Sequence, residues 1–135
     1  MKITPSFIIV AVLVLAAAVP AFAHHSFAAE FDADKPMTLT GSVTKLDWIN
    51  PHARLFIEVK GADGKVTNWE IELGPPAMLM RSGWTKNSVK AGDMVTVNGS
   101  LAKDGSNLAN ARSATLADGT KVFAGSPAEF SPSPR

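Results

Sequence analysis

Three histidines are the side chains in this sequence whose positions favour metal chemistry. His24 and His25 stand side by side directly after an Ala-x-Ala tripeptide, and His52 follows Pro51. If the chain is cleaved after Ala23, His24 gains a free α-amine, and the amine and imidazole of one residue can chelate one metal ion. A third nitrogen from His52 would give a set that suits Cu(II), the divalent first-row ion that nitrogen sites bind most strongly.

Other interpretations of these histidines remain open. In a variant of the copper site, the α-amine, the intervening amide and the His25 imidazole form fused chelate rings. The acceptors that would orient a ligand imidazole are the carboxylates of Glu30, Asp32 and Asp34. In the simpler interpretation the His-His pair is only a polar, soluble start of the mature chain, and His52 only caps a strand or forms a hydrogen bond with a nearby carbonyl. Three histidines are a thin ligand set, which makes the simpler interpretation the default.

The N-terminus has the organisation of a secretory signal peptide. Lys2 gives it a positive start, residues 7–18 are an almost uninterrupted apolar run, and a small-residue cleavage site follows Pro20. The apolar run is shorter than the roughly 20 residues of a membrane span. We therefore predict a signal peptide over residues 1–23, cleavage before His24, and a periplasmic mature protein without a membrane span.

The composition of the mature part limits the possible functions. The chain contains no cysteine, which excludes a disulfide framework and a cysteine-linked lipid anchor. Removal of residues 1–23 takes one lysine with it and leaves 12 basic against 12 acidic side chains. This balance argues against binding to nucleic acid or acidic lipid. A chain of this size suits one domain with one modest core.

The residues after the histidine pair must position any site, and most of them show strand periodicity. Residues 24–36 have no clear period and are predicted to form an extended arm. A long strand then runs from Met37 to Trp48, and its apolar parity changes near Thr44 and Lys45. One extra residue at that point indicates a β-bulge that re-aims the second half of the strand.

The remaining predicted elements are shorter strands and one short helix, separated by turns rich in glycine, proline and aspartate. The strands are expected at residues 54–60, 66–73, 94–101, 109–116 and 121–124, and the helix at residues 77–82. The tail over residues 126–135 is rich in serine and proline and is expected to be disordered. The folded domain is therefore expected to span residues 37–125.

This order of elements predicts an all-β domain with one short helix, built as a small five- to six-stranded OB-type barrel. Three meandering strands come first, then a helix, then two more strands, and the first strand is bulged. An immunoglobulin-like sandwich is the main alternative. It has about seven strands and does not need the helix, so we favour the barrel.

Four sequence motifs together resemble a known family. They are HHSFAAEFD at residues 24–32, WINPH at residues 48–52, RSGWTK at residues 81–86 and KDGS at residues 103–106. The set resembles the secreted bacterial domain-of-unknown-function family 6152, over the mature chain from residue 24 to about residue 125. The resemblance implies a small exported single-domain protein and no particular reaction.

Two tryptophans and two arginines are candidates for contact with a ligand or partner on the barrel face. They are Trp48, Arg54, Arg81 and Trp84. Trp84 follows a glycine and has basic residues on either side, so it is the best candidate for an exposed contact. Trp69 is in phase with apolar neighbours on its predicted strand, and we assign it to the core.

The motifs favour a binding protein over an enzyme. The chain has no His-Glu-x-x-His, no Gly-x-Ser-x-Gly and no phosphate-binding glycine loop. Glu70 and Glu72 alternate with apolar residues on a predicted strand, which indicates a solvent-exposed face. We therefore expect an exported, non-catalytic binding or interaction protein for an unknown small ligand or envelope protein. Periplasmic copper binding or delivery through His24, His25 and His52 is the alternative.

Overall fold

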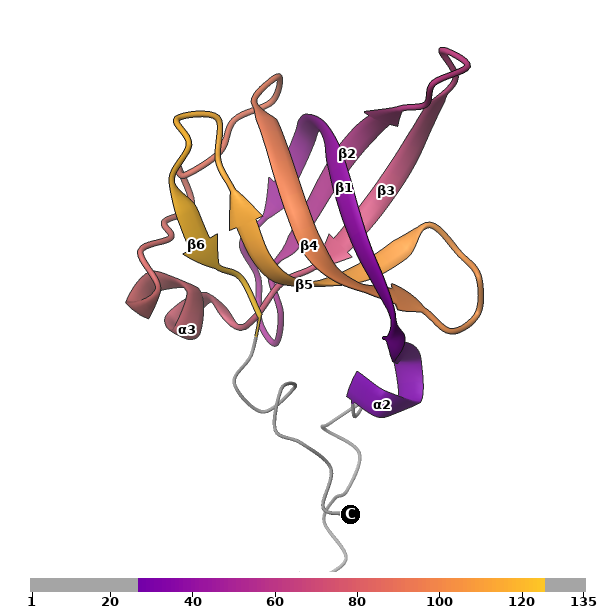
Figure 1. Cartoon of the computed structure of the whole chain (residues 1–135). Helices are drawn as coiled ribbons and strands as arrows, with labels where there is room; N and C mark the ends of the chain where they lie inside the picture. The colour runs from indigo at the N-terminus through magenta and orange to yellow at the C-terminus, as the bar shows by residue number, and fades with distance from the viewer. Residues whose placement is uncertain (1–26, 126–135) are drawn as a thin grey trace, which may run out of the picture.

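The computed structural model describes residues 27–125. The predicted signal peptide, His24, His25 and the predicted disordered tail lie outside the described residues. In chain order the elements are α2 (Phe27–Glu30), β1 (Phe31–Asp47), β2 (Arg54–Lys60), β3 (Val66–Glu72), α3 (Pro76–Arg81), β4 (Met94–Ala102), β5 (Leu108–Thr115) and β6 (Lys121–Phe123), as Figure 1 shows. No helix within the described range is long and apolar enough to cross a membrane.

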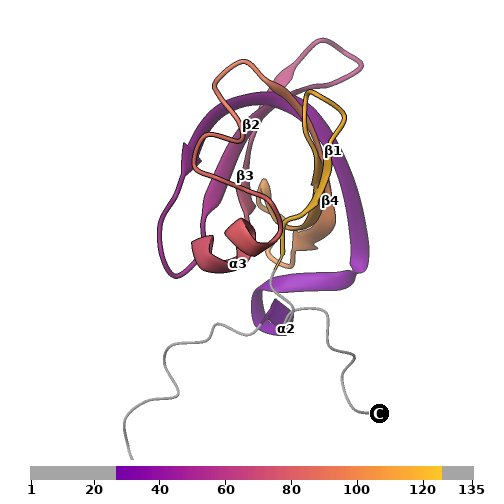
Figure 2. The same cartoon turned by 90° about the vertical axis from the view of Figure 1, so that its left-hand side faces the viewer.

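A parallel pairing closes five of the strands into a barrel. The order in the sheet is β3-β2-β1-β4-β5-β6, and β3 also pairs with β5. This last pairing is parallel, with Ile71 opposite Ala109, whereas the other pairings are antiparallel. Figure 2 shows the resulting ring, and both views place α2 and α3 at the same end of it. The predicted OB-type barrel is confirmed, and α2 adds a second short helix.

The first strand, β1, reaches both of its neighbours because it is long and bulged. It has 17 residues, pairs with β4 from Phe31 to Ser42, and pairs with β2 from Ser42 to Asp47. The register against β2 shifts between Val43 and Lys45, which confirms the predicted β-bulge. Because a bulge bends a strand and increases its twist, β1 can pass from one neighbour to the next around the ring.

The boundaries of the later elements follow the sequence pattern closely. The predicted strands after the first, and the predicted helix, agree with the structure to within one residue at each end. The start of the first strand differs more, since β1 begins at Phe31 and the apolar alternation begins at Met37. Residues 32–35 have no ladder partner in β4, and this interruption hides the earlier start of the strand from a periodicity argument.

Trp84 lies in the core, so the prediction of an exposed contact at this position is wrong. Its side chain is 1% exposed, and its Nε1 donates a hydrogen bond to the carbonyl oxygen of Phe123 at 3.1 Å. Gly83, with φ of 95°, ends α3 and turns the chain back toward the barrel. The neighbouring charged residues Arg81 and Lys86 remain exposed while the indole between them is buried. Trp69 is half-buried and packs against the core, in line with its assignment.

The residues before the barrel pack against it. Residues 27–30 are helical, which corrects the prediction of an extended arm in this part. Phe31 is 2% exposed, is buried outside the cluster that fills the barrel, and stacks on Phe27 with ring centroids 5.7 Å apart. Lys103 donates its backbone N–H to the carbonyl oxygen of Glu30 at 2.9 Å and its Nζ to that of Ala28 at 2.5 Å. Buried aromatic area and two hydrogen bonds therefore anchor this segment.

Gly99 provides a test of the close strand approach that the barrel requires. A Cβ at this position would overlap the carbonyl oxygen of Asn110 on the neighbouring strand β5. We expect Gly99→Ala to lower the free energy of unfolding by about 3 kcal/mol, because the paired backbones would have to separate. The control is Gly119→Ala, in a turn with φ of 85° and open space around it, where strain alone costs about 1 kcal/mol.

Urea denaturation followed by tryptophan fluorescence measures both losses. Equal losses in the two variants would contradict the close approach.

Candidate functional site

A cleft of about 700 Å³ opens beside α2, and it contains one of the predicted metal ligands and one of the predicted contact residues. Its walls come from α2, from the loop between β1 and β2, from the ends of β2 and β3, and from the loop after β4. His52 and Arg54 are both among the lining residues, whereas Trp48, Arg81 and Trp84 are not. The structure therefore does not bring the four predicted contact residues together.

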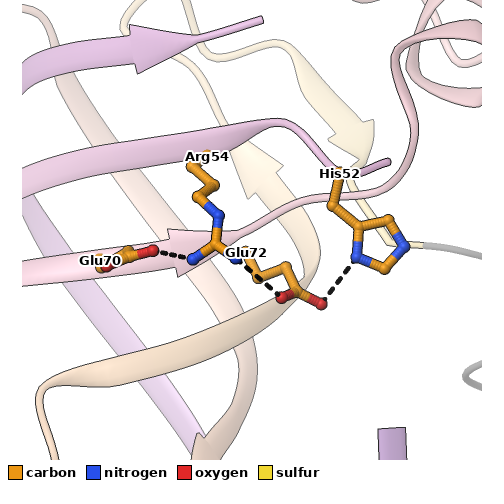
Figure 3. A network of polar contacts seen from close by, with 4 residues as sticks. All are labelled: His52, Arg54, Glu70 and Glu72. Carbon is orange, nitrogen blue, oxygen red and sulfur yellow. Dashed lines mark hydrogen bonds and ion pairs between the residues drawn. The ribbon is translucent and has the colours of Figure 1, made fainter. Parts of the chain in front are cut away.

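A network of four charged or polar side chains lies at the cleft wall, and three of them, His52, Arg54 and Glu72, line the cleft (Figure 3). Nδ1 of His52 lies 3.0 Å from Oε1 of Glu72. Arg54 donates a hydrogen bond from Nη1 to Oε1 of Glu70, and its Nη2 lies 3.9 Å from Oε2 of Glu72. The Glu72 side chain is 9% exposed and that of His52 is 30% exposed. Both oxygens of a buried carboxylate thus face a partner.

The hairpin register brings these residues together. In the antiparallel β2–β3 pair, Arg54 stands opposite Glu72 and Phe56 stands opposite Glu70. Side chains of paired residues lie on the same face of a sheet, so Arg54 can reach both carboxylates on β3. Backbone hydrogen bonds continue the pairing past the strand ends. The N–H of Ala53 donates to the carbonyl oxygen of residue 74 at 3.1 Å, and the carbonyl oxygen of Ala53 accepts from the N–H of residue 73 at 2.9 Å. This holds His52 beside the end of β3.

Glu72 is the functional candidate that sequence reasoning missed. Its alternation with apolar residues predicted exposure to solvent, but Glu72 is buried and that expectation is wrong. The reason is that β3 lies between two strands at this point, with Arg54 opposite on β2 and Asn110 opposite on β5. The signal in the sequence was the register of the hairpin, which places Arg54 opposite Glu72.

The contact with Glu72 determines the state of the His52 ring. A carboxylate oxygen accepts hydrogen bonds, so Nδ1 of His52 carries the ring hydrogen and donates a hydrogen bond to Glu72. In the neutral ring the lone pair is then on Nε2, which points away from Glu72 (Figure 3). This is the arrangement by which carboxylates orient histidines that bind metals. Glu72 therefore occupies the position that the sequence suggested for Glu30, Asp32 or Asp34.

Negative charge predominates around the cleft. The carboxylates of Glu30, Glu70, Glu72 and Asp104 outnumber the cations of Arg54 and Lys103. The hydrogen bond with Glu70 is the main cause that raises the pKa of Arg54, burial opposes it, and the charges of Glu70, Glu72 and Glu30 add to it. Hydrogen bonds from Ser106 lower the pKa of Asp104. Both groups are therefore ionised at neutral pH.

Within residues 27–125, no three histidine or carboxylate side chains gather closely enough to hold a metal ion. His52 would therefore need donors from elsewhere to form a metal centre. His24 and His25, the other two predicted ligands, lie outside the described residues.

Comparison with known proteins identifies the family. The sequence matches the model of domain-of-unknown-function family 6152, described as a family of unknown function, over residues 11–111. The chain belongs to this family. The resemblance carried by the sequence motifs is thus confirmed. In this family 6152 protein, His52 of the WINPH motif lines the cleft, and so do Lys103 and Asp104 of the KDGS motif.

No curated protein has a matching sequence. Among solved structures, the mitochondrial single-stranded DNA-binding protein from S. cerevisiae is similar to this chain, with 14% sequence identity and a TM-score of 0.48. The similarity covers 61% of this chain and 92% of that chain.

The buried position of Glu72 leads to a stability prediction. We expect Glu72→Gln to lower the free energy of unfolding by about 2 kcal/mol, because Arg54 and His52 lose a charged partner in a site shielded from water. Glu70→Gln is the control, since Glu70 is about a third exposed and its ion pair should contribute less than about 1 kcal/mol. Urea denaturation at neutral pH measures both losses, and a loss for Glu72→Gln no larger than that of the control would contradict the assignment.

Proposed function

We propose that this protein is an exported, non-catalytic binding protein and that its small ligand occupies the cleft beside His52. The observation that carries the proposal is the buried carboxylate of Glu72, held on one side by Arg54 and on the other by His52 at the cleft wall. Burying a charge is costly unless it is paired. A fixed polar wall of this kind pre-orients groups for a ligand, which lowers the entropic cost of binding.

The dimensions of the cleft support a small molecule or ion. Ligand sites in proteins have volumes of roughly 300–1,000 Å³, and the cleft, at about 700 Å³, lies within that range. It combines apolar surface from Ile49, Pro51 and Pro75 with the polar network. Such a mixture is typical of sites in which apolar contacts supply affinity and a few polar groups supply orientation.

The chemistry of the cleft supports binding rather than catalysis. Among residues 27–125, the side chains that line the cleft include no serine, threonine or cysteine that could act as a nucleophile beside His52. Both oxygens of Glu72 face partners, so this carboxylate holds other side chains in place. The proposal of export rests on the signal-peptide pattern of residues 1–23.

The proposal is tested by filling the cleft. Ala29 is an exposed residue of α2 that lines it, and Ala77 is an exposed residue of α3 that does not. We expect Ala29→Trp to weaken ligand binding at least tenfold by occupying the space, whereas Ala77→Trp, the matched control, leaves binding unchanged.

The probes are divalent metal ions, amino acids, polyamines and short sugars, screened by thermal unfolding and titration calorimetry. A probe at 100 times its Kd should stabilise the wild-type protein by about 2.7 kcal/mol. The proposal is wrong if no probe stabilises the wild-type protein, or if the two tryptophan variants weaken binding equally.

A further inference from the structure

Building on the proposed function, we infer that the ligand of this cleft is an aliphatic diamine or polyamine. Its ammonium groups donate hydrogen bonds to the carboxylate of Glu30, to Nε2 of His52 and to the amide oxygen of Asn110, and its alkyl chain packs on the apolar wall. All three side chains lie within residues 27–125, the part of the chain that the structure describes.

The positive groups of the cleft are engaged with acceptors of the protein itself. Arg54 donates a hydrogen bond to Glu70, and its Nη2 lies 3.9 Å from Oε2 of Glu72. Nζ of Lys103 donates to the carbonyl oxygen of Ala28 at 2.5 Å. An anionic ligand would have to compete with these contacts for both cations, and it would meet the carboxylates beside them. The arrangement of charge therefore favours a cation.

Two acceptors at the cleft surface, in contrast, have no partner within residues 27–125. The carboxylate of Glu30, half-buried at the end of α2, accepts no hydrogen bond and forms no ion pair there. Nδ1 of His52 is directed to Glu72, and Nε2 has no such contact in the same part of the chain. An ammonium group complements these acceptors, because it carries three donors, no acceptor and a positive charge.

A buried amide beside Glu72 is also unsatisfied. Asn110 is 1% exposed, and neither polar atom of its side chain has a hydrogen-bond partner among the described residues. Asn110 stands opposite Glu72 in the β3–β5 pair, so the two side chains lie on the same face of the sheet. A buried amide without a partner costs stability. A ligand donor that enters beside Glu72 would satisfy the oxygen of this amide.

The negative charges around the cleft are in excess but are spread out. The carboxylates exceed the cations by two. Within residues 27–125, however, no three histidine or carboxylate side chains gather closely enough to hold one metal ion. Two positive charges separated along one molecule fit both observations, because each ammonium group needs only its own acceptors.

The apolar wall of the cleft favours an alkyl chain between those charges. Ile49, Pro51 and Pro75 line the cleft, and Ile49 is 49% exposed. Burial of methylene groups against such a surface is favourable, and an inorganic cation lacks this contribution. A diamine or polyamine supplies the separated charges and the apolar chain in one molecule.

The experiment is titration calorimetry of the purified protein with cadaverine and spermidine as probes. Pentanediol and glutarate are the matched controls, since they share the carbon-chain length of cadaverine but carry no charge or negative charge. We expect one amine per chain and at least tenfold weaker binding of both controls. Equal binding of pentanediol, or tighter binding of glutarate, would overturn the inference because the charge of the ligand would then not be recognised.

Two variants and a control test the assigned contacts. Glu30→Gln should weaken cadaverine binding at least tenfold, because it removes a charge at nearly constant size. Glu58→Gln makes the same change at an exposed position of β2 that does not line the cleft, and it should leave the affinity unchanged. Asn110→Leu should weaken binding at least threefold and raise the thermal midpoint of the ligand-free protein, because an unsatisfied buried amide is removed.

Unchanged affinity in Glu30→Gln, equal weakening by Glu58→Gln, or unchanged affinity in Asn110→Leu would each overturn the inference. If neither amine binds while another probe does so and is blocked by Ala29→Trp, the amine inference fails and the proposed function stands. If no probe binds, both fail.

Discussion

The parallel pairing between β3 and β5 is the constraint on which the rest of the structure depends. Without it, β3 and the first residues of β5 would form open edges, whose unpaired backbone groups favour association with other chains. With it, Ile71 and Ala109 lie in a closed interior and are fully buried. The pairing ends with Glu72 opposite Asn110, so the barrel closes at the point where the cleft begins.

This closure explains why a carboxylate at the end of a strand becomes part of a site. A glutamate on a sheet edge would remain hydrated, but Glu72 has a neighbouring strand on each side and little access to water. A buried carboxylate requires donors or positive charge close to it. Arg54 supplies the charge from the opposite strand, and His52 supplies a donor from the preceding loop. The orientation of the imidazole is therefore a consequence of how the barrel closes.

Local patterns in the sequence predicted the elements well, and contacts between distant segments account for the errors. The bulge in β1 and the strand at residues 54–60 follow from alternation alone. The burial of Glu72 depends on β5, about 40 residues further along the chain, and alternation within β3 contains no information about it. The same reason applies to Trp84. Its charged neighbours indicated exposure, but its indole donates a hydrogen bond to Phe123 on β6. The pairing of Arg54 with Glu72 was accessible, because the intervening turn fixes the register.

The cleft joins two parts of the molecule that are stabilised in different ways. One wall belongs to the closed barrel, whereas the other is α2, a helix of four residues that is too short to be stable in water by itself. Its order depends on Phe31, which is buried outside the barrel core, and on the two hydrogen bonds from Lys103. A ligand in the cleft would touch both walls, so its binding and the attachment of α2 to the barrel would be thermodynamically linked.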